Sequence, residues 1–112
     1  MAGGQTHDMA ARKYAPPRSW VADGGEWPGG PLRSDAPPYA VVTASIVSAY
    51  RAAAGTRSLR SVAGDAGIDP TSLGRMLNGE TVPDVHTVAV LEVALGAPLW
   101  PDYPRSHPSR TS

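Results

Sequence analysis

The sequence predicts an all-α domain of four to five short helices with a disordered segment at each end. Between residues 40 and 100, apolar side chains recur at spacings of three and four, which is the period of an amphipathic helix. No stretch alternates apolar and polar residues as a half-buried strand would, and no internal repeat is present. Glycine and proline gather outside this region, in runs such as WPGGP and DAPP. These observations separate one helical core from its flanks.

The domain organisation follows from the same composition. Residues 1–39 form a Pro/Gly-rich arm and residues 101–112 (PDYPRSHPSRTS) a tail. Both offer too little apolar surface to offset the entropy of ordering, so we expect both to be disordered. The remaining residues, 40–100, are few for a domain but enough to fold alone.

The first two helices are expected at 40–55 and 59–66. The first has an apolar stripe and ends at Gly55, and the second begins with Ser58 as its N-cap. Gly64 weakens the second helix by about 1 kcal/mol relative to alanine, so packing must hold it. The inward-facing residues are Val42, Ile46, Tyr50 and Ala53 in the first helix, and Leu59, Val62, Ala63 and Ala66 in the second.

The third helix has both ends marked in the sequence. Asp69 is a good N-cap, and Pro70 suits the first helical position, where a missing N–H is no loss. Gly79 stands where a left-handed C-terminal residue is expected. The apolar face consists of Leu73, Met76 and Leu77.

The fourth helix is expected at 85–96, with Gly96 and Pro98 ending it. Its inward stripe is Val85, Val88, Leu91 and Leu95. Val90 and Val93 lie off this stripe and belong either to the edge of the core or to a dimer face; we favour the edge of the core. Leu99 and Trp100 are expected to fold back over the core.

Composition excludes several classes of protein. Cysteine is absent, which removes disulfides and cysteine-ligated zinc, and the three histidines are scattered along the chain without metal-ligand spacing. No nucleophile elbow, phosphate-binding loop or zinc-protease motif occurs, so we expect no enzyme activity, no metal and no cofactor. No apolar run is long enough for a leader or a membrane span, which favours a cytoplasmic protein. The abundance of Ala, Gly, Pro and Arg is typical of a high-GC genome such as that of an actinobacterium.

Charge gives no support for a nucleic-acid partner at the level of the whole chain. The formal net charge is zero, and in residues 40–100 four arginines stand against five carboxylates. The strong basic footprint of a phosphate-binding protein is missing, so DNA binding would depend on how the charges are distributed.

The region around Gly67 nevertheless has the pattern of a helix-turn-helix. Ala63 is small where the two helices would cross, Gly67 permits a tight turn, and Ile68 follows it as an apolar plug. Residues 58–79, SLRSVAGDAGIDPTSLGRMLNG, resemble the lambda-repressor-like (Cro/Xre family) helix-turn-helix domains, and the resemblance extends over about 42–100. The sequence departs from the family pattern at Gly64 and Asp65, at Pro70, and at Glu80.

The resemblance implies a set of contacts with double-stranded DNA. The third helix would enter the major groove by its N-terminus. Candidates for reading bases are Pro70, Thr71, Ser72 and Arg75; candidates for phosphate contacts are Ser58, Leu59, Arg60 and Asn78. Four of them have a structural alternative, because Ser58 acts as a cap, Thr71 and Ser72 suit any solvated first turn, and Asn78 suits any helix end.

The expected function is that of a transcriptional regulator, a repressor that occupies its operator as a homodimer. The alternative is a protein-interaction module, antitoxin-type or polymerase-associated, that uses the same fold and the tryptophan-bearing arm. Trp20 and Trp27 lie in that arm, where they would dock on a protein partner or fold back on the core. Arg12, Lys13 and Arg18 would give the arm a weak phosphate contact instead.

Overall fold

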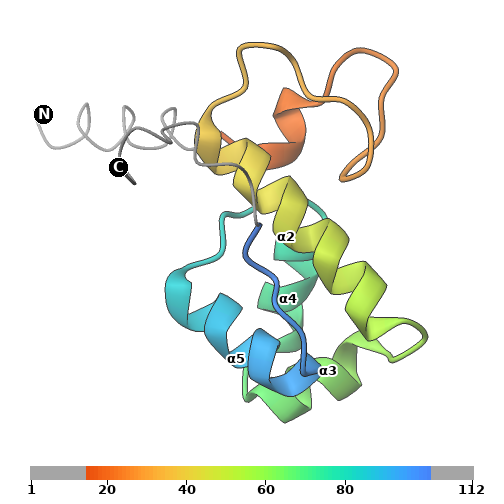
Figure 1. The fold of residues 1–112 in the computed structure, drawn as a ribbon, viewed down its shortest axis with the longest axis vertical. Coiled ribbons are helices and arrows are strands. Elements are labelled where there is room, and N and C mark those ends of the chain that lie inside the picture. Colours follow the sequence, from red (N-terminus) through yellow and green to blue (C-terminus); the bar gives the residue numbers. More distant parts are fainter. Residues whose placement is uncertain (1–14, 102–112) are drawn as a thin grey trace, which may run out of the picture.

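The computed structural model describes residues 15–101, and these form a bundle of helices (Figure 1). The elements are the 3₁₀ helix η1 (Pro17–Trp20) and the α-helices α2 (Pro38–Ala54), α3 (Leu59–Ala66), α4 (Pro70–Leu77) and α5 (Val85–Leu95). Within these residues the only β-type pairing is an isolated antiparallel bridge between Val21 and Leu32. The predicted all-α fold is confirmed.

The predicted helix ends follow the local sequence. The Ser58 side chain accepts a hydrogen bond from the Ser61 backbone N–H, and the Asp69 carboxylate accepts one from the Ser72 N–H. Gly55 and Gly67 end α2 and α3 with positive φ values of 56 and 73. These caps satisfy backbone groups that a helix end leaves unpaired. The start of α2 differs: it lies at Pro38, because proline fits the first turn of a helix.

Side chains from all four α-helices form one core. The predicted inward faces of α3 and α4 are confirmed, with Leu59 and Ala66 partly buried at the edge of the core. In α2, Ile46 and Tyr50 are buried and Val42 is partly buried, as predicted, but Ala54 and not Ala53 belongs to the core. Leu99 covers the core after α5 and is 1% exposed. The Glu92 carboxylate holds it by accepting hydrogen bonds from the backbone N–H groups of Leu99 (2.7 Å) and Trp100 (3.3 Å). Trp100 itself is 43% exposed, so Leu99 alone covers the core as predicted.

The prediction for α5 is partly wrong. Val88 and Leu91 are fully buried, but Val85 is 70% exposed and Val93 is 84% exposed. Val85 is therefore outside the core, and Val93 does not belong to the core edge. The sequence of α5, VHTVAVLEVAL, is apolar on nearly every side, so its periodicity could not define the inward face.

The predicted disorder of residues 1–39 is wrong for residues 15–39. Residues 15–37, here named the N-terminal segment, fold over the N-terminal half of α2 (Figure 1). The Tyr39 hydroxyl donates to the Ala15 carbonyl (2.8 Å) and accepts from the Trp20 indole N–H (3.2 Å). Pro17 in η1 is buried, and the bridge between Val21 and Leu32 joins two parts of the segment itself. Residues 1–14 of the predicted arm and 102–112 of the predicted tail lie outside the described residues.

Burial of Trp27 accounts for much of this order. Its ring packs partly buried against the core, and its indole N–H donates to the Leu77 carbonyl at the end of α4 (2.9 Å). A large aromatic surface removed from water stabilises the segment despite its glycines and prolines. Of the two outcomes open for the tryptophans, the structure shows that this part of the chain folds back on its own core.

Candidate nucleic-acid interface

Helices α3 and α4 form a helix-turn-helix. They are joined at Gly67, whose left-handed conformation turns the chain sharply, and Ile68 packs against the core just beyond the turn. Ala63 is fully buried at the crossing. A Cβ atom added at Gly74 would lie 3.6 Å from the Leu59 Cδ1 atom, so the first turn of α3 lies against the middle of α4. The predicted turn geometry is confirmed.

The two faces of α4 differ in chemistry. Leu73, Met76 and Leu77 are buried and fix the helix to the core. The other face is polar, and the exposed residues on it are Thr71, Ser72 and Arg75. Among residues 15–101, the Arg75 guanidinium has no carboxylate within ion-pair distance. It is therefore available to a ligand outside the chain.

The first turn of α4 is fixed by its cap. Asp69 Oδ2 accepts hydrogen bonds from the Ser72 backbone N–H (3.0 Å) and from the Ser72 hydroxyl (3.2 Å). The Ser72 hydroxyl is thus already used within the helix, whereas Thr71 is exposed. Pro70 is half-buried at the first position and has no N–H to donate. Of the four base-reading candidates, Thr71 and Arg75 have the most freely available polar groups.

The phosphate candidates lie at both ends of the motif. Ser58 caps α3, and Leu59 is partly buried against the core, so any contact from Leu59 must come from its backbone. Arg60 is exposed on the first turn of α3. Asn78 is exposed as the C-cap of α4.

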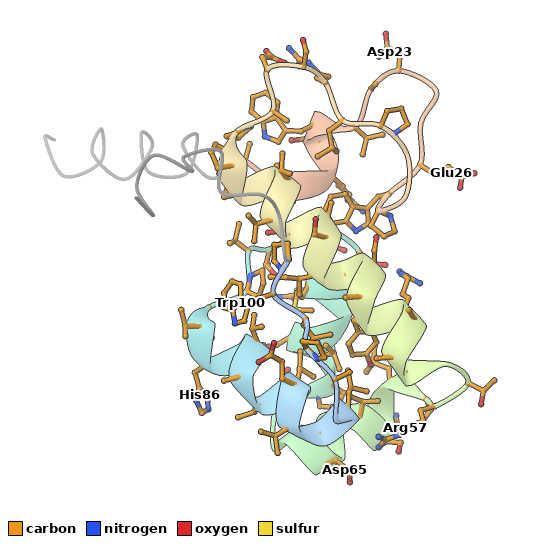
Figure 2. All side chains as sticks on the ribbon, in the orientation of Figure 1. Asp23, Glu26, Arg57, Asp65, His86 and Trp100 are labelled. Carbon is orange, nitrogen blue, oxygen red and sulfur yellow. The ribbon has the colours of Figure 1, made fainter. Side chains whose placement is uncertain are left out.

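The distribution of charged side chains supports DNA binding at the helix-turn-helix more than the zero net charge of the chain does. Arg33 pairs with Asp35 (2.9 Å) and Arg57 pairs with Asp65, an exposed pair visible in Figure 2. Within the described residues, the arginines without an ion pair are Arg18, Arg51, Arg60 and Arg75. The carboxylates of Asp69 and Asp84 are used as helix N-caps. A hydrogen bond from the Thr87 backbone N–H lowers the pKa of Asp84.

Two arginines without an ion pair within residues 15–101, Arg18 and Arg51, contact the C-terminal end of α4. Arg51 was not predicted from the sequence to bind DNA. The Leu77 carbonyl accepts a hydrogen bond from Arg51 Nη2 (3.4 Å) as well as from Trp27. The Gly79 carbonyl accepts one from the backbone N–H of Arg18 (2.9 Å). Arg51 is far from the motif in sequence, and no local pattern identified it.

A shallow groove of about 310 Å³ lies beside the polar face of α4. Its lining includes Ser72 and Arg75 of α4, and Val82, Asp84 and Thr87 from the loop after α4 and the start of α5. The groove therefore combines one positively charged side chain, one carboxylate and a small apolar surface.

Comparison with known proteins agrees with this geometry. Residues 47–100 match the family described as a helix-turn-helix domain. No curated protein and no solved structure gives a significant match. The match agrees with the helix-turn-helix that α3 and α4 form in the structure; in DNA-binding proteins the second helix of this motif enters the major groove.

The match begins within α2 and ends just after Leu99, so it includes α3, α4 and α5. It does not extend to the N-terminal segment. Among the described residues, no helix is long and apolar enough to cross a bilayer.

Proposed function

We propose that this protein is a sequence-specific transcriptional regulator of the lambda-repressor-like (Cro/Xre) type. It represses by occupying an operator, with α4 in the major groove. The observation that carries the proposal is the division of α4 into a buried apolar face and an exposed face that bears the unpaired Arg75.

Arg75 reads a base in this mechanism. A guanidinium matches the O6 and N7 acceptors of guanine with two parallel hydrogen bonds. The side chain is one turn beyond Thr71, on a helix that Asp69 caps and whose rear face is held by the core. Thr71 contacts a base edge or a phosphate from the first turn. No bond is made or broken, and neither a cofactor nor a metal takes part.

Phosphate contacts position the helix. Arg60 and the backbone N–H groups after Ser58 face one phosphate, and Asn78 faces another at the opposite end of the motif. Such contacts carry affinity without sequence information.

A homodimer on a palindromic operator raises the affinity of so small a domain. Two copies of α4 would then be about 34 Å apart, one turn of DNA. Along α5, Val85, Ala89 and Val93 are exposed at spacings of four, and they give the second copy an apolar surface.

A protein-interaction module is the second candidate. The zero net charge, Pro70 and Glu80 favour it. The tryptophans give it less support than the sequence suggests, because Trp20 and Trp27 both have partners within the chain. An antitoxin-type or polymerase-associated protein would bind its partner through the exposed face of α5 instead. In either role we place the protein in the cytoplasm, and its composition favours an actinobacterial source.

The experiment that tests the proposal is a selection of fragments from a high-GC actinobacterial genome with the purified chain at low salt. Enrichment of one inverted repeat supports a dimeric regulator and identifies the operator. Failure to enrich any sequence contradicts the proposed function. Salt-insensitive capture of one protein partner from an actinobacterial cell extract would favour the second candidate, since DNA binding weakens steeply with salt.

A further inference from the structure

We propose that the N-terminal segment is part of the DNA-binding surface and that Arg18 contacts a backbone phosphate of duplex DNA beside the C-terminal end of α4. This inference rests on the proposed function. It adds a contact from outside residues 47–100, the part that matches the helix-turn-helix family.

The backbone places Arg18 against the loop that follows α4. The Arg18 N–H donates to the Gly79 carbonyl (2.9 Å). A Cβ atom at Gly79 would lie 2.7 Å from the Arg18 Cβ atom, so the two residues are in direct contact. Gly79 is buried, whereas the neighbouring Asn78, a phosphate candidate, is exposed. The Arg18 side chain therefore begins next to a position where a phosphate is already expected.

Contacts on both sides hold Arg18 in this place. The preceding residue, Pro17, is buried. Further along, the Trp27 indole N–H donates to the Leu77 carbonyl, one residue before Asn78. A side chain whose backbone is held in position loses less freedom on binding, which favours affinity.

The charges of the segment single out Arg18 among its basic residues. Arg18 is exposed and has no carboxylate partner within residues 15–101. Arg33 pairs with Asp35, and its guanidinium lies 5.3 Å from the centre of the Trp20 ring. Figure 2 shows Asp23 and Glu26 on the outer loops, pointing away from the helices. Arg18 is thus the free cation of the segment, and Arg33 is its matched control.

A purely structural role for Arg18 has different consequences. A cation near the C-terminal end of a helix stabilises the helix dipole, so Arg18 could act on α4 alone. In that case a neutral side chain would lower the thermal midpoint but leave the salt dependence of DNA binding unchanged. A phosphate contact changes the salt dependence, because each one releases counterions from the DNA.

The test measures fluorescence anisotropy of two labelled duplexes, the selected operator and a random sequence, over a range of salt. It compares the full chain with Arg18→Gln, and with Arg33→Gln as the control. We expect Arg18→Gln to weaken binding to both duplexes by the same factor and to reduce the slope of log K against log salt by about 0.9. Arg33→Gln should keep the wild-type slope.

An unchanged slope for Arg18→Gln would overturn this inference, whether or not its thermal midpoint falls. Weakening on the operator but not on the random duplex would also overturn it, since that pattern belongs to a base contact. Arg75→Ala separates the two proposals. If Arg75→Ala lowers operator preference while Arg18→Gln has no effect on the slope, only the role of Arg18 fails. If the wild-type chain binds neither duplex, the proposed function fails as well.

Discussion

At the residue scale, Gly79 joins the N-terminal segment to the helix-turn-helix. It has a φ of 74, in the left-handed region, and the Trp27 ring lies directly over it. A Cβ atom there would approach the Trp27 Cε2 atom to 2.6 Å. Both the backbone conformation and the contact therefore require glycine at this position.

Replacing Gly79 with alanine should destabilise the protein more than the backbone conformation alone explains. Gly67→Ala is the matched control, because Gly67 has nearly the same φ of 73 but no atom within 4 Å of an added Cβ. We expect a loss of about 1 kcal/mol for Gly67→Ala, from the left-handed strain, and a larger loss for Gly79→Ala. Urea unfolding of both variants checks this. Equal losses would mean that Trp27 does not lie on Gly79.

Tyr50→Phe should stabilise the protein. The Tyr50 side chain is 4% exposed, and its hydroxyl has no hydrogen-bond partner within the described residues. Removing a buried, unpaired hydroxyl should raise the free energy of unfolding by about 1 kcal/mol. A fall in stability on urea unfolding would show that the hydroxyl is paired.

The same substitution should change the alkaline limb of the stability profile. Burial raises the pKa of Tyr50 above its usual value of 10.0, although Arg57 and Arg51 oppose the shift. A raised pKa in the folded state means that the contribution of Tyr50 to stability is fully present below pH 10.0 and is lost as the pH rises through the folded-state pKa. The wild type should therefore lose more stability than Tyr50→Phe above this pH. Identical slopes in thermal scans across that range would contradict the assignment.

At the scale of elements, α3 and α4 were predictable because their signals are local. Ser58 and Asp69 each cap the helix that follows by accepting a hydrogen bond from the backbone N–H three residues on, and Gly67 adopts the left-handed conformation of the turn. Arg75 was predictable as an exposed residue because it lies off the apolar stripe of α4. The inward face of α5 was not predictable, because the valines of this helix lie on several of its sides. Only tertiary packing determines that Val88 is buried and Val85 is exposed.

Gly64→Ala should stabilise α3. Gly64 is exposed within the helix, and an added Cβ would meet no atom within 4 Å. Alanine is favoured over glycine in a helix interior by about 1 kcal/mol, so the thermal midpoint should rise. Gly74→Ala is a useful comparison, because its Cβ would contact Leu59 at 3.6 Å. A lower midpoint for Gly64→Ala would show that glycine is required there.

At the scale of the whole molecule, the order of the N-terminal segment was not predicted, although the folding back of its tryptophans on the core was one of two outcomes left open. Its contacts are long-range: the hydrogen bond from Trp27 to Leu77 spans 50 residues. The composition of the segment, rich in glycine and proline, indicates disorder, and no local pattern reveals the surface that Trp27 covers. For the same reason, the contact between Arg18 and Gly79 could not be predicted from the sequence.

Removing the segment should therefore destabilise the helical domain. A chain that begins at residue 38 lacks the Trp27 contact, and we expect its free energy of unfolding to be lower by about 2 kcal/mol than that of a chain beginning at residue 15. Thermal unfolding followed by circular dichroism makes the comparison. Equal midpoints would show that the segment contributes nothing to the fold.

The measurement that tests the central claim most directly is the ratio of affinities for the operator and for a scrambled duplex, in the wild type and in Arg75→Ala. Arg33→Ala is the control, because Arg33 is paired and distant in sequence from α4. The proposed base contact predicts that Arg75→Ala lowers the ratio by about 5- to 150-fold, as expected for a bidentate contact worth about 1–3 kcal/mol, while Arg33→Ala leaves it unchanged. A ratio that survives in Arg75→Ala would contradict the placement of α4 as the helix that reads DNA.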